Sequence, residues 1–210
     1  MSGKPQLLYF ELSGRGEVIR LLYKHAGADF EDKRISFQDY GQNYKTNAEE
    51  CPLAFLPVLT TSCGKKISQT TAIIRYVANE LKLFGKNNVE QALIDLTIVS
   101  NKELSDKAID IVFSQKSDEE KAKLKESLKT AIDKYFTYFE KLVKENGGPF
   151  LVGSEITVGD IYLTDCLNGL TEYKILDVQQ LLEKYPLLKD IYEKVLQSDN
   201  IKRYLENQKK

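Results

Sequence analysis

Hydrophobic and polar positions change period along the first part of the chain. Gln6–Phe10 is a short apolar and aromatic run, which predicts a buried strand. The turn residues Ser13–Gly16 end this run, and from Glu17 apolar residues recur at helical spacing until Gly27 supplies a stop. The pattern therefore predicts a strand, a glycine-rich turn and a helix, followed by a second strand over residues 30–35.

A polar segment, a hairpin and another helix complete this first part. Residues 36–54 predict a long loop or an irregular short helix, and long loops are often functional. Leu56–Thr61 predicts a strand that begins at Pro57, because proline cannot donate to a sheet ladder. A glycine turn then leads into a short strand over 65–68, and residues 69–81 place their apolar side chains on one helical face.

The composition changes after this helix. Residues 82–89 contain glycine and asparagine and predict a linker. Beyond it almost every segment has helical spacing, and the predicted helices are Glu90–Ile111, Glu119–Asn146, Val158–Tyr173, Val178–Lys184 and Pro186–Gln197. Thr157 can cap the third of these helices while Asp160 reaches back to the cap. We therefore expect an α+β domain over 1–81 and an all-α domain over 90–210.

Composition and charge exclude several classes of function. Lys plus Arg number 30 and Asp plus Glu number 31, so a nucleic-acid partner is not expected. No apolar run approaches the roughly 20 residues of a membrane helix, and the start has no apolar signal core, so we expect no membrane partner and a cytoplasmic location. The cysteines Cys51, Cys63 and Cys166 form no CxxC pair, and His25 is the one histidine, so we expect no metal site.

Several segments together resemble one enzyme family. They are Leu8–Glu17 with Ile19 and Arg20, Leu56–Leu59, Ile67–Ile73 with Arg75 and Tyr76, Gln91–Asp95, and Phe150–Gly153 leading to Thr157–Asp160. Their joint order and spacing is similar to that of the alpha- and sigma-type cytosolic glutathione transferases, over nearly the whole chain. The resemblance implies a thioredoxin-like α+β N-terminal domain that binds glutathione and an all-α C-terminal domain.

The resemblance implies that Tyr9 and Arg15 are catalytic. Tyr9 matches the tyrosine whose hydroxyl donates a hydrogen bond to the glutathione sulfur, and Arg15 matches a cation beside that sulfur. A free thiol has a pKa of about 8.5, so a hydrogen bond to the thiolate and a nearby cation both favour the reactive form. The alternatives are a core aromatic residue for Tyr9 and a surface arginine for Arg15. The glycines on either side of Arg15 favour the functional interpretation, because small neighbours let a ligand approach.

Four more residues match positions that hold the tripeptide in the family. Pro57 resembles the family's cis-proline, beside which the Leu56 backbone would pair with glutathione as an added strand. Gln69 and Thr70 open a helix, whose free N–H groups would hold the γ-glutamyl carboxylate. Thr70 could equally be a plain helix cap.

Two further matches depend on looser correspondences. Lys45 resembles the basic residue at the glycyl carboxylate, with Tyr44 competing for the same place. Glu103 falls where the family has an aspartate that reaches the γ-glutamyl amine across a homodimer, which the resemblance also implies. An apolar stripe that includes Leu96 and Val99 suits either a dimer interface or the core of a single chain.

The leading hypothesis is therefore a detoxification enzyme that conjugates reduced glutathione to hydrophobic electrophiles. The electrophile would lie against the helical domain near Asp106–Phe113 and the last helices. Glutathione is the co-substrate, and no other cofactor is expected. A glutathione-dependent isomerase or peroxidase, and a non-catalytic carrier of apolar compounds with the same fold, remain open alternatives.

Overall fold

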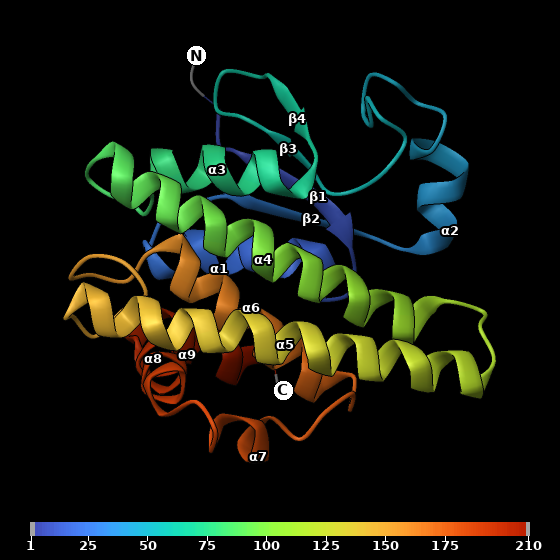
Figure 1. Ribbon diagram of the computed structural model, residues 1–210. Helices are drawn as coiled ribbons and strands as arrows, with labels where there is room; N and C mark the ends of the chain where they lie inside the picture. Colours follow the sequence, from blue (N-terminus) through green and yellow to red (C-terminus); the bar gives the residue numbers. More distant parts are fainter. Residues whose placement is uncertain (1–2, 209–210) are drawn as a thin grey trace. The chain divides into compact units, whose positions relative to one another are not determined.

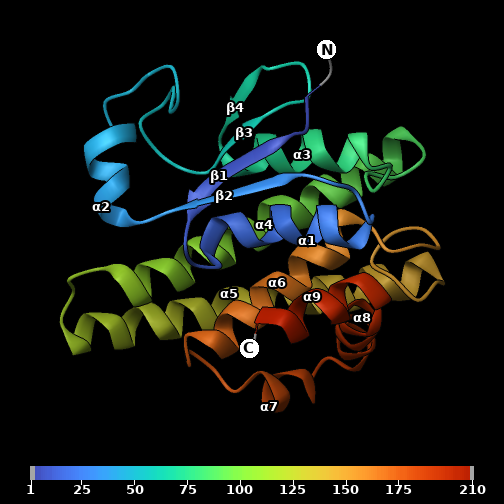
Figure 2. The same cartoon turned by 180° about the vertical axis from the view of Figure 1, so that it is seen from behind.

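The computed structural model describes residues 3–208 and divides the chain into two compact units. One unit contains the residues up to Lys82 together with those from Asp199 onward, and the other spans Leu83–Ser198. The sequence placed everything from residue 90 onward in the helical domain. The structure differs at the C-terminal end, where the last helix packs on the first helix of the chain (Figure 2).

A four-stranded mixed sheet forms the centre of the first unit (Figure 1). Its strands are ordered β2–β1–β3–β4, with bounds Glu31–Ile35 for β2, Gln6–Phe10 for β1, Val58–Thr60 for β3 and Lys66–Ser68 for β4. β1 runs parallel to β2 and antiparallel to β3, and β3 pairs antiparallel with β4. All the predicted strands are present, and β3 is shorter than the predicted run.

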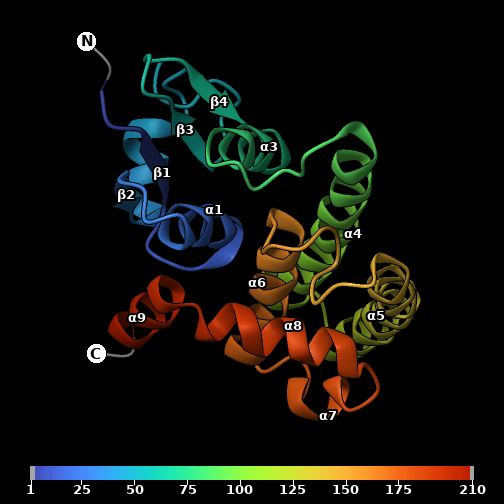
Figure 3. The same cartoon turned by 90° about the vertical axis from the view of Figure 1, so that its left-hand side faces the viewer.

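Helices α1 (Gly14–His25) and α3 (Thr70–Glu80) pack against each other and on the sheet (Figure 3). Their apolar faces form the core of the unit with β1 and β3, and the fully buried side chains include Leu7, Ile19, Leu21, Leu22, Leu59, Ile73 and Ile74. α1 begins at Gly14, earlier than the predicted Glu17. The glycine-rich segment therefore supplies the first turn of the helix.

The polar segment after β2 contains a short helix, α2 (Phe37–Asp39), and a single turn of π-helix, η1 (Tyr40–Tyr44). The Ser36 hydroxyl accepts the N–H of Asp39 and caps α2. The Phe37 ring stacks on Phe10 with centroids 4.3 Å apart, which holds α2 against the end of β1. This segment is the irregular short helix of the two predicted possibilities.

Helix α9 (Asp199–Gln208) is the element that the sequence did not predict. It lies beside α1 in the first unit (Figures 2 and 3). The segment is short and polar, and Ile201 is its one buried residue within the described part of the helix. The local sequence of α9 has few apolar positions, so it gave little sign of a helix. Packing against α1, which is far away in the sequence, stabilises it.

The second unit is all helical (Figure 1). Its helices are α4 (Asn88–Phe113), α5 (Asp118–Asn146), α6 (Val158–Glu172), α7 (Val178–Leu182) and α8 (Pro186–Gln197). They correspond to the predicted helices, with small shifts at their ends. The expected cap of α6 is confirmed, because the Asp160 carboxylate accepts the N–H and the hydroxyl of Thr157, both at 2.8 Å.

Candidate active site

Tyr9 lies near the carboxyl end of β1 with its ring buried and its hydroxyl at the start of α1. The side chain is 5% exposed, and its oxygen accepts the backbone N–H of Arg15 at 2.9 Å. This N–H belongs to the first turn of the helix, where amide groups lack an intrahelical acceptor. A phenol can accept a hydrogen bond through its oxygen and donate another through its O–H. The α1 N-terminus therefore fixes the position of the Tyr9 hydroxyl.

Gly14 and Gly16 make room for the Tyr9 ring. A Cβ atom on Gly16 would lie 2.5 Å from Tyr9 Cδ1, and one on Gly14 would lie 2.7 Å from the Tyr9 hydroxyl oxygen. Gly14 also has a φ of +42°, which side chains disfavour. Tyr9 itself therefore needs glycine at both positions, because it occupies the space that a side chain at either one would take.

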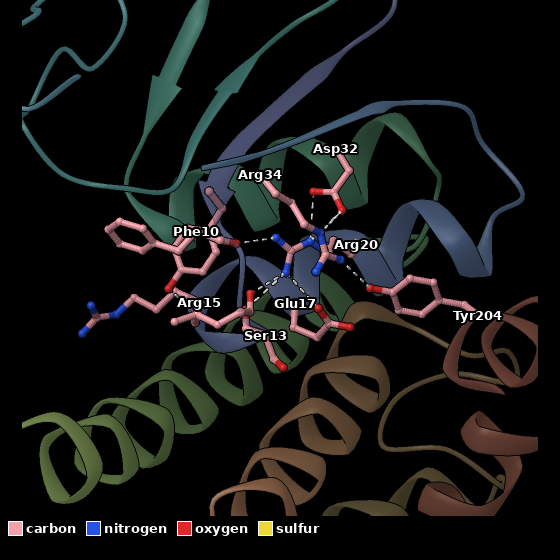
Figure 4. Close-up of polar contacts among 10 residues, drawn as sticks. Phe10, Ser13, Arg15, Glu17, Arg20, Asp32, Arg34 and Tyr204 are labelled. Carbon is pink, nitrogen blue, oxygen red and sulfur yellow. Dashed lines mark hydrogen bonds and ion pairs between the residues drawn. The ribbon is translucent and has the colours of Figure 1, made fainter. Parts of the chain in front are cut away.

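The Arg15 side chain has a different environment from its backbone. It is half-exposed, and in Figure 4 it extends away from the side chains gathered around Arg20. The structure thus gives the Arg15 N–H a direct contact with Tyr9.

The sheet register brings three of the predicted residues to one end of the sheet, where neighbouring strands begin or finish. Leu8 pairs with Val58 in β3, and Val58 pairs with Ser68 in β4. The residues one step further along these strands are Tyr9, Pro57 and Gln69, so they follow one another across the same end of the sheet. The bond between Leu56 and Pro57 is cis. Residues far apart in the sequence therefore gather where α1 and α3 begin.

The start of α3 has two unusual features. Gln69, the residue before the helix, is exposed and has a φ of +76°, a left-handed value that is rare for a residue with a side chain. Thr70, the first helical residue, is buried. Beside them the Ser68 hydroxyl is buried without a hydrogen-bond partner. The backbone here is held in a conformation that local preferences do not favour, which is common where a ligand binds.

Lys45 and Tyr44 lie at the end of η1. Lys45 is exposed, and Tyr44 is half-buried with the Lys33 ammonium 5.5 Å from its ring centroid. A hydrogen bond with Tyr44 is the largest influence on Lys33 and raises the pKa of that ammonium. Tyr44 is thus engaged with Lys33, and Lys45 projects from the surface.

Glu103 belongs to the second unit, on the exposed face of α4. Its carboxylate accepts the hydroxyl of Tyr135 and lies 3.9 Å from the Lys107 ammonium. The hydrogen bond to this carboxylate raises the pKa of Tyr135. Leu96 and Val99, on the same face, are also exposed, so the stripe that they form is not part of the core of this chain.

Residues 3–208 also bear on metal binding and on membrane insertion. No group of three or more His, Cys, Asp and Glu side chains gathers within this range in a way that could hold a metal ion. Among the helices of the same range, none has the length and hydropathy to cross a membrane.

Comparison with protein families matches both parts of the chain. Residues 5–79 match the model "Glutathione S-transferase, N-terminal domain", and residues 102–208 match "Glutathione S-transferase, C-terminal domain". The chain belongs to the glutathione S-transferase family. Curated relatives agree: it is 34% identical to glutathione S-transferase alpha-2 of Rattus norvegicus over 98% of this chain and 90% of that protein. A glutathione S-transferase of Gallus gallus is 33% identical with the same coverage.

Solved structures match this fold over nearly the whole chain. A nematode-specific transferase from C. elegans superposes with a TM-score of 0.83 at 30% identity, covering 97% of this chain and 96% of that one. Prostaglandin synthase D of Nilaparvata lugens gives 0.80 at 30% identity, covering 97% of both chains. The monomeric Na-GST-3 of the hookworm Necator americanus gives 0.81 at 29% identity, with the same coverage. The protein is therefore a glutathione transferase, with a thioredoxin-like N-terminal domain and a helical C-terminal domain.

One buried charge beside the site of this transferase was missed by the sequence analysis. Arg20 is fully buried in α1, and its guanidinium carbon lies 5.7 Å from the centroid of the Tyr9 ring. It forms ion pairs with Glu17 and Asp32, both at 3.0 Å. A signal was present, because an arginine within the apolar face of a helix must be paired when it is buried.

Proposed function

We propose that Tyr9 stabilises the thiolate of bound glutathione and that this thiolate attacks a hydrophobic electrophile. The contact between the Arg15 N–H and the Tyr9 oxygen carries the proposal, because it fixes the phenol at the edge where the predicted tripeptide contacts gather. A preorganised donor aimed at a sulfur favours its charged form and lowers the thiol pKa. The Arg15 guanidinium adds positive charge on the same side of the sulfur.

The other proposed glutathione contacts lie around the same end of the sheet. The Leu56 backbone, next to the cis bond, pairs with the peptide backbone of glutathione. Gln69 and Thr70 hold the γ-glutamyl carboxylate at the start of α3, where free N–H groups and the helix dipole favour an anion. Lys45 meets the glycyl carboxylate as an exposed cation. This arrangement uses glutathione as co-substrate and needs no metal.

The helical unit offers apolar surface for the electrophile at the end of α4. Phe113 is 50% exposed, and its ring meets Tyr173 edge-on with centroids 5.8 Å apart. An aromatic pair with one exposed ring offers apolar surface to flat apolar compounds. The chemical class that we propose for the second substrate is therefore a hydrophobic electrophile, as part of a cytoplasmic detoxification role.

A homodimer completes the proposal. Val89, Ala92, Leu96 and Val99 recur at spacings of three and four along α4 and are all exposed, so they form one apolar face. Glu103 continues this face by one more turn, which supports its role at the γ-glutamyl amine of a partner subunit. Light scattering of the purified protein tests this, since a monomer would leave Glu103 without that role.

The thiol pKa of bound glutathione is the decisive measurement. Thiolate absorbance of the binary complex is followed against pH for the wild type, Tyr9→Phe and the control Tyr192→Phe, whose lost hydroxyl contacts Asn168 in the helical unit at 2.9 Å. One hydrogen bond to a charged group contributes about 1.5–3 kcal/mol, so Tyr9→Phe should raise the thiol pKa by roughly one to two units. The control should match the wild type.

The outcomes separate the alternatives. Retention of Tyr9→Phe on immobilised glutathione, together with slow conjugation of a chromogenic aryl halide, supports the transferase mechanism. Retention of the wild type without any turnover would favour the carrier. A wild-type complex whose thiol keeps its ordinary acidity would refute the role given to Tyr9.

A further inference from the structure

Five polar side chains from three elements of the first unit form a ring of polar contacts, and Figure 4 draws those around Arg20 and that between Arg34 and Tyr204. Arg20 pairs with Glu17 through Nη1 and with Asp32 through Nε, and Arg34 pairs with Asp32 through its Nε at 2.8 Å. Arg34 Nη2 donates to the Tyr204 hydroxyl at 3.3 Å. Tyr204 and Glu17 also interact, since burial first, and then the charge of Glu17, raise the pKa of the Tyr204 hydroxyl. The ring thus joins α1, β2 and α9, and Tyr204 is its one member from α9.

The remaining donors of Arg20 hold the turn between β1 and α1. Nη1 donates to the carbonyl of Leu12 at 2.9 Å and lies 3.4 Å from that of Ser13, and Nη2 donates to the carbonyl of Phe10 at 3.2 Å. These carbonyls belong to the segment that connects Tyr9 to the first turn of α1. The position of Arg20 therefore decides where the N–H that contacts the Tyr9 oxygen lies.

Arg20 also acts on Tyr9 directly. Its guanidinium lies within the distance at which a cation interacts with an aromatic ring. A cation against the ring withdraws electron density from the phenol and makes its O–H a stronger donor. Since Arg20 is fully buried, water does not screen this interaction as it would at the surface. Both the direction and the strength of the Tyr9 hydrogen bond depend on how firmly Arg20 is held.

Tyr204 closes the ring on the side away from the turn. Because its pKa is raised, the Tyr204 hydroxyl stays protonated and can donate to the Glu17 carboxylate. The Lys24 ammonium lies 5.7 Å from the centroid of its ring and helps to keep the side chain in place. Without the hydroxyl, Glu17 and Arg34 lose the partner that they share, and Glu17 is freer to rotate away from Arg20.

We propose that Tyr204 is a positioning residue of the thiolate site, which holds Arg20 behind Tyr9 through Glu17 and Arg34. This inference rests on the function proposed for Tyr9, and it gives the C-terminal helix a part in the chemistry of the N-terminal unit. Tyr204 acts through other residues and need not touch glutathione.

The test compares Tyr204→Phe with the control Tyr192→Phe, since each loses one hydroxyl that bonds a neighbouring side chain. Two quantities are measured on the full chain: the thiol pKa of bound glutathione and the affinity for S-methylglutathione, which has no thiol. We expect Tyr204→Phe to raise the thiol pKa by roughly half a unit, a threefold loss of thiolate at a pH below the pKa, with unchanged affinity for the thioether. The control should leave both quantities unchanged.

A second variant checks that the ring acts as a unit. Arg34→Gln alone should raise the thiol pKa in the same direction, and adding it to Tyr204→Phe should raise the pKa by less than the sum of the two single effects. The inference is overturned if Tyr204→Phe lowers stability but keeps the wild-type thiol pKa, or if the two substitutions are additive. A wild-type thiol of ordinary acidity would instead refute the proposal for Tyr9 itself.

Discussion

Adding one methyl group at Gly16 should disable the site by moving Tyr9. The new Cβ would lie 2.5 Å from Tyr9 Cδ1 and 2.7 Å from Cγ. Because carbon atoms in contact are separated by about 3.5–4.0 Å, the ring must move by roughly 1 Å. The backbone is also close on the hydroxyl side of the ring, since a Cβ on Gly14 would lie 2.7 Å from the Tyr9 oxygen. The ring therefore has little room to adjust in its plane.

Two energies compete in the stability of Gly16→Ala. Overpacking a buried position costs about 1–3 kcal/mol, whereas alanine favours a helix over glycine by about 1 kcal/mol. The net loss should be about 1 kcal/mol, which leaves the protein folded. The effect on chemistry is larger, because a displacement of about 1 Å in a catalytic group can reduce the rate on the order of 100-fold.

The assay measures conjugation of a chromogenic aryl halide at saturating glutathione, together with the thiol pKa of the binary complex. Gly169→Ala is the matched control, because Gly169 is also helical and a Cβ there would have no atom within 4 Å. We expect Gly16→Ala to lose most of its kcat and to raise the thiol pKa, while Gly169→Ala stays active. Wild-type turnover and thiol pKa in Gly16→Ala would show that the position of Tyr9 does not control the reaction.

Three further substitutions test the fold and the assembly. Burial raises the pKa of Asp160 to about 6 from 3.8, so the folded state favours its protonated form. The stability of the wild type relative to Asp160→Asn should therefore rise by about 2 kcal/mol as pH falls from 6 to 4, and a constant difference in urea unfolding at a series of pH values would contradict this. Glu140→Ala should lower the free energy of unfolding by about 1–3 kcal/mol, because the Glu140 carboxylate accepts the N–H groups of Leu187 and Leu188 at the start of α8. An unchanged urea midpoint would count against this cap. Leu96→Glu should convert the proposed dimer to a monomer in light scattering, whereas Ala122→Glu, at an exposed position of α5, should leave the dimer intact. Equal masses for the two variants would argue against the α4 face as the dimer interface.

The end of the sheet that carries Tyr9 could be predicted because the elements that meet there, β1, β3 and α3, have strong local sequence patterns. The apolar run before Gly14 predicts β1, Pro57 predicts the start of a strand, and Thr70 opens a helix with a continuous apolar face. Each signal comes from backbone preferences within a few residues. Pairing of these strands places Tyr9, Pro57 and Gln69 side by side, so correct local predictions were enough to bring these three residues together.

The ring around Arg20 could not be predicted in the same way. β2 has the sequence Glu31–Ile35 with charged residues on both faces, so it shows no alternation that would indicate which side chains turn toward α1. Helix α9 depends on its contact with α1. Nothing near Tyr204 in the sequence indicates a partner such as Arg34, which lies 170 positions earlier. Long-range polar contacts of this kind become visible when the fold is known.

The cost of burying Arg20 indicates why a charge is used there. Removing a charge from water costs several kcal/mol, and apolar side chains of similar volume often replace buried ion pairs without loss of stability. An apolar residue at this position, however, would leave the carbonyls of Phe10 and Leu12 without the donor that they have now. Those carbonyls need a donor because the chain leaves a strand and enters a helix within a few residues, and this abrupt change is what sets the Tyr9 hydroxyl against the first turn of α1. The buried cation is therefore a consequence of the geometry that the proposed thiolate site requires.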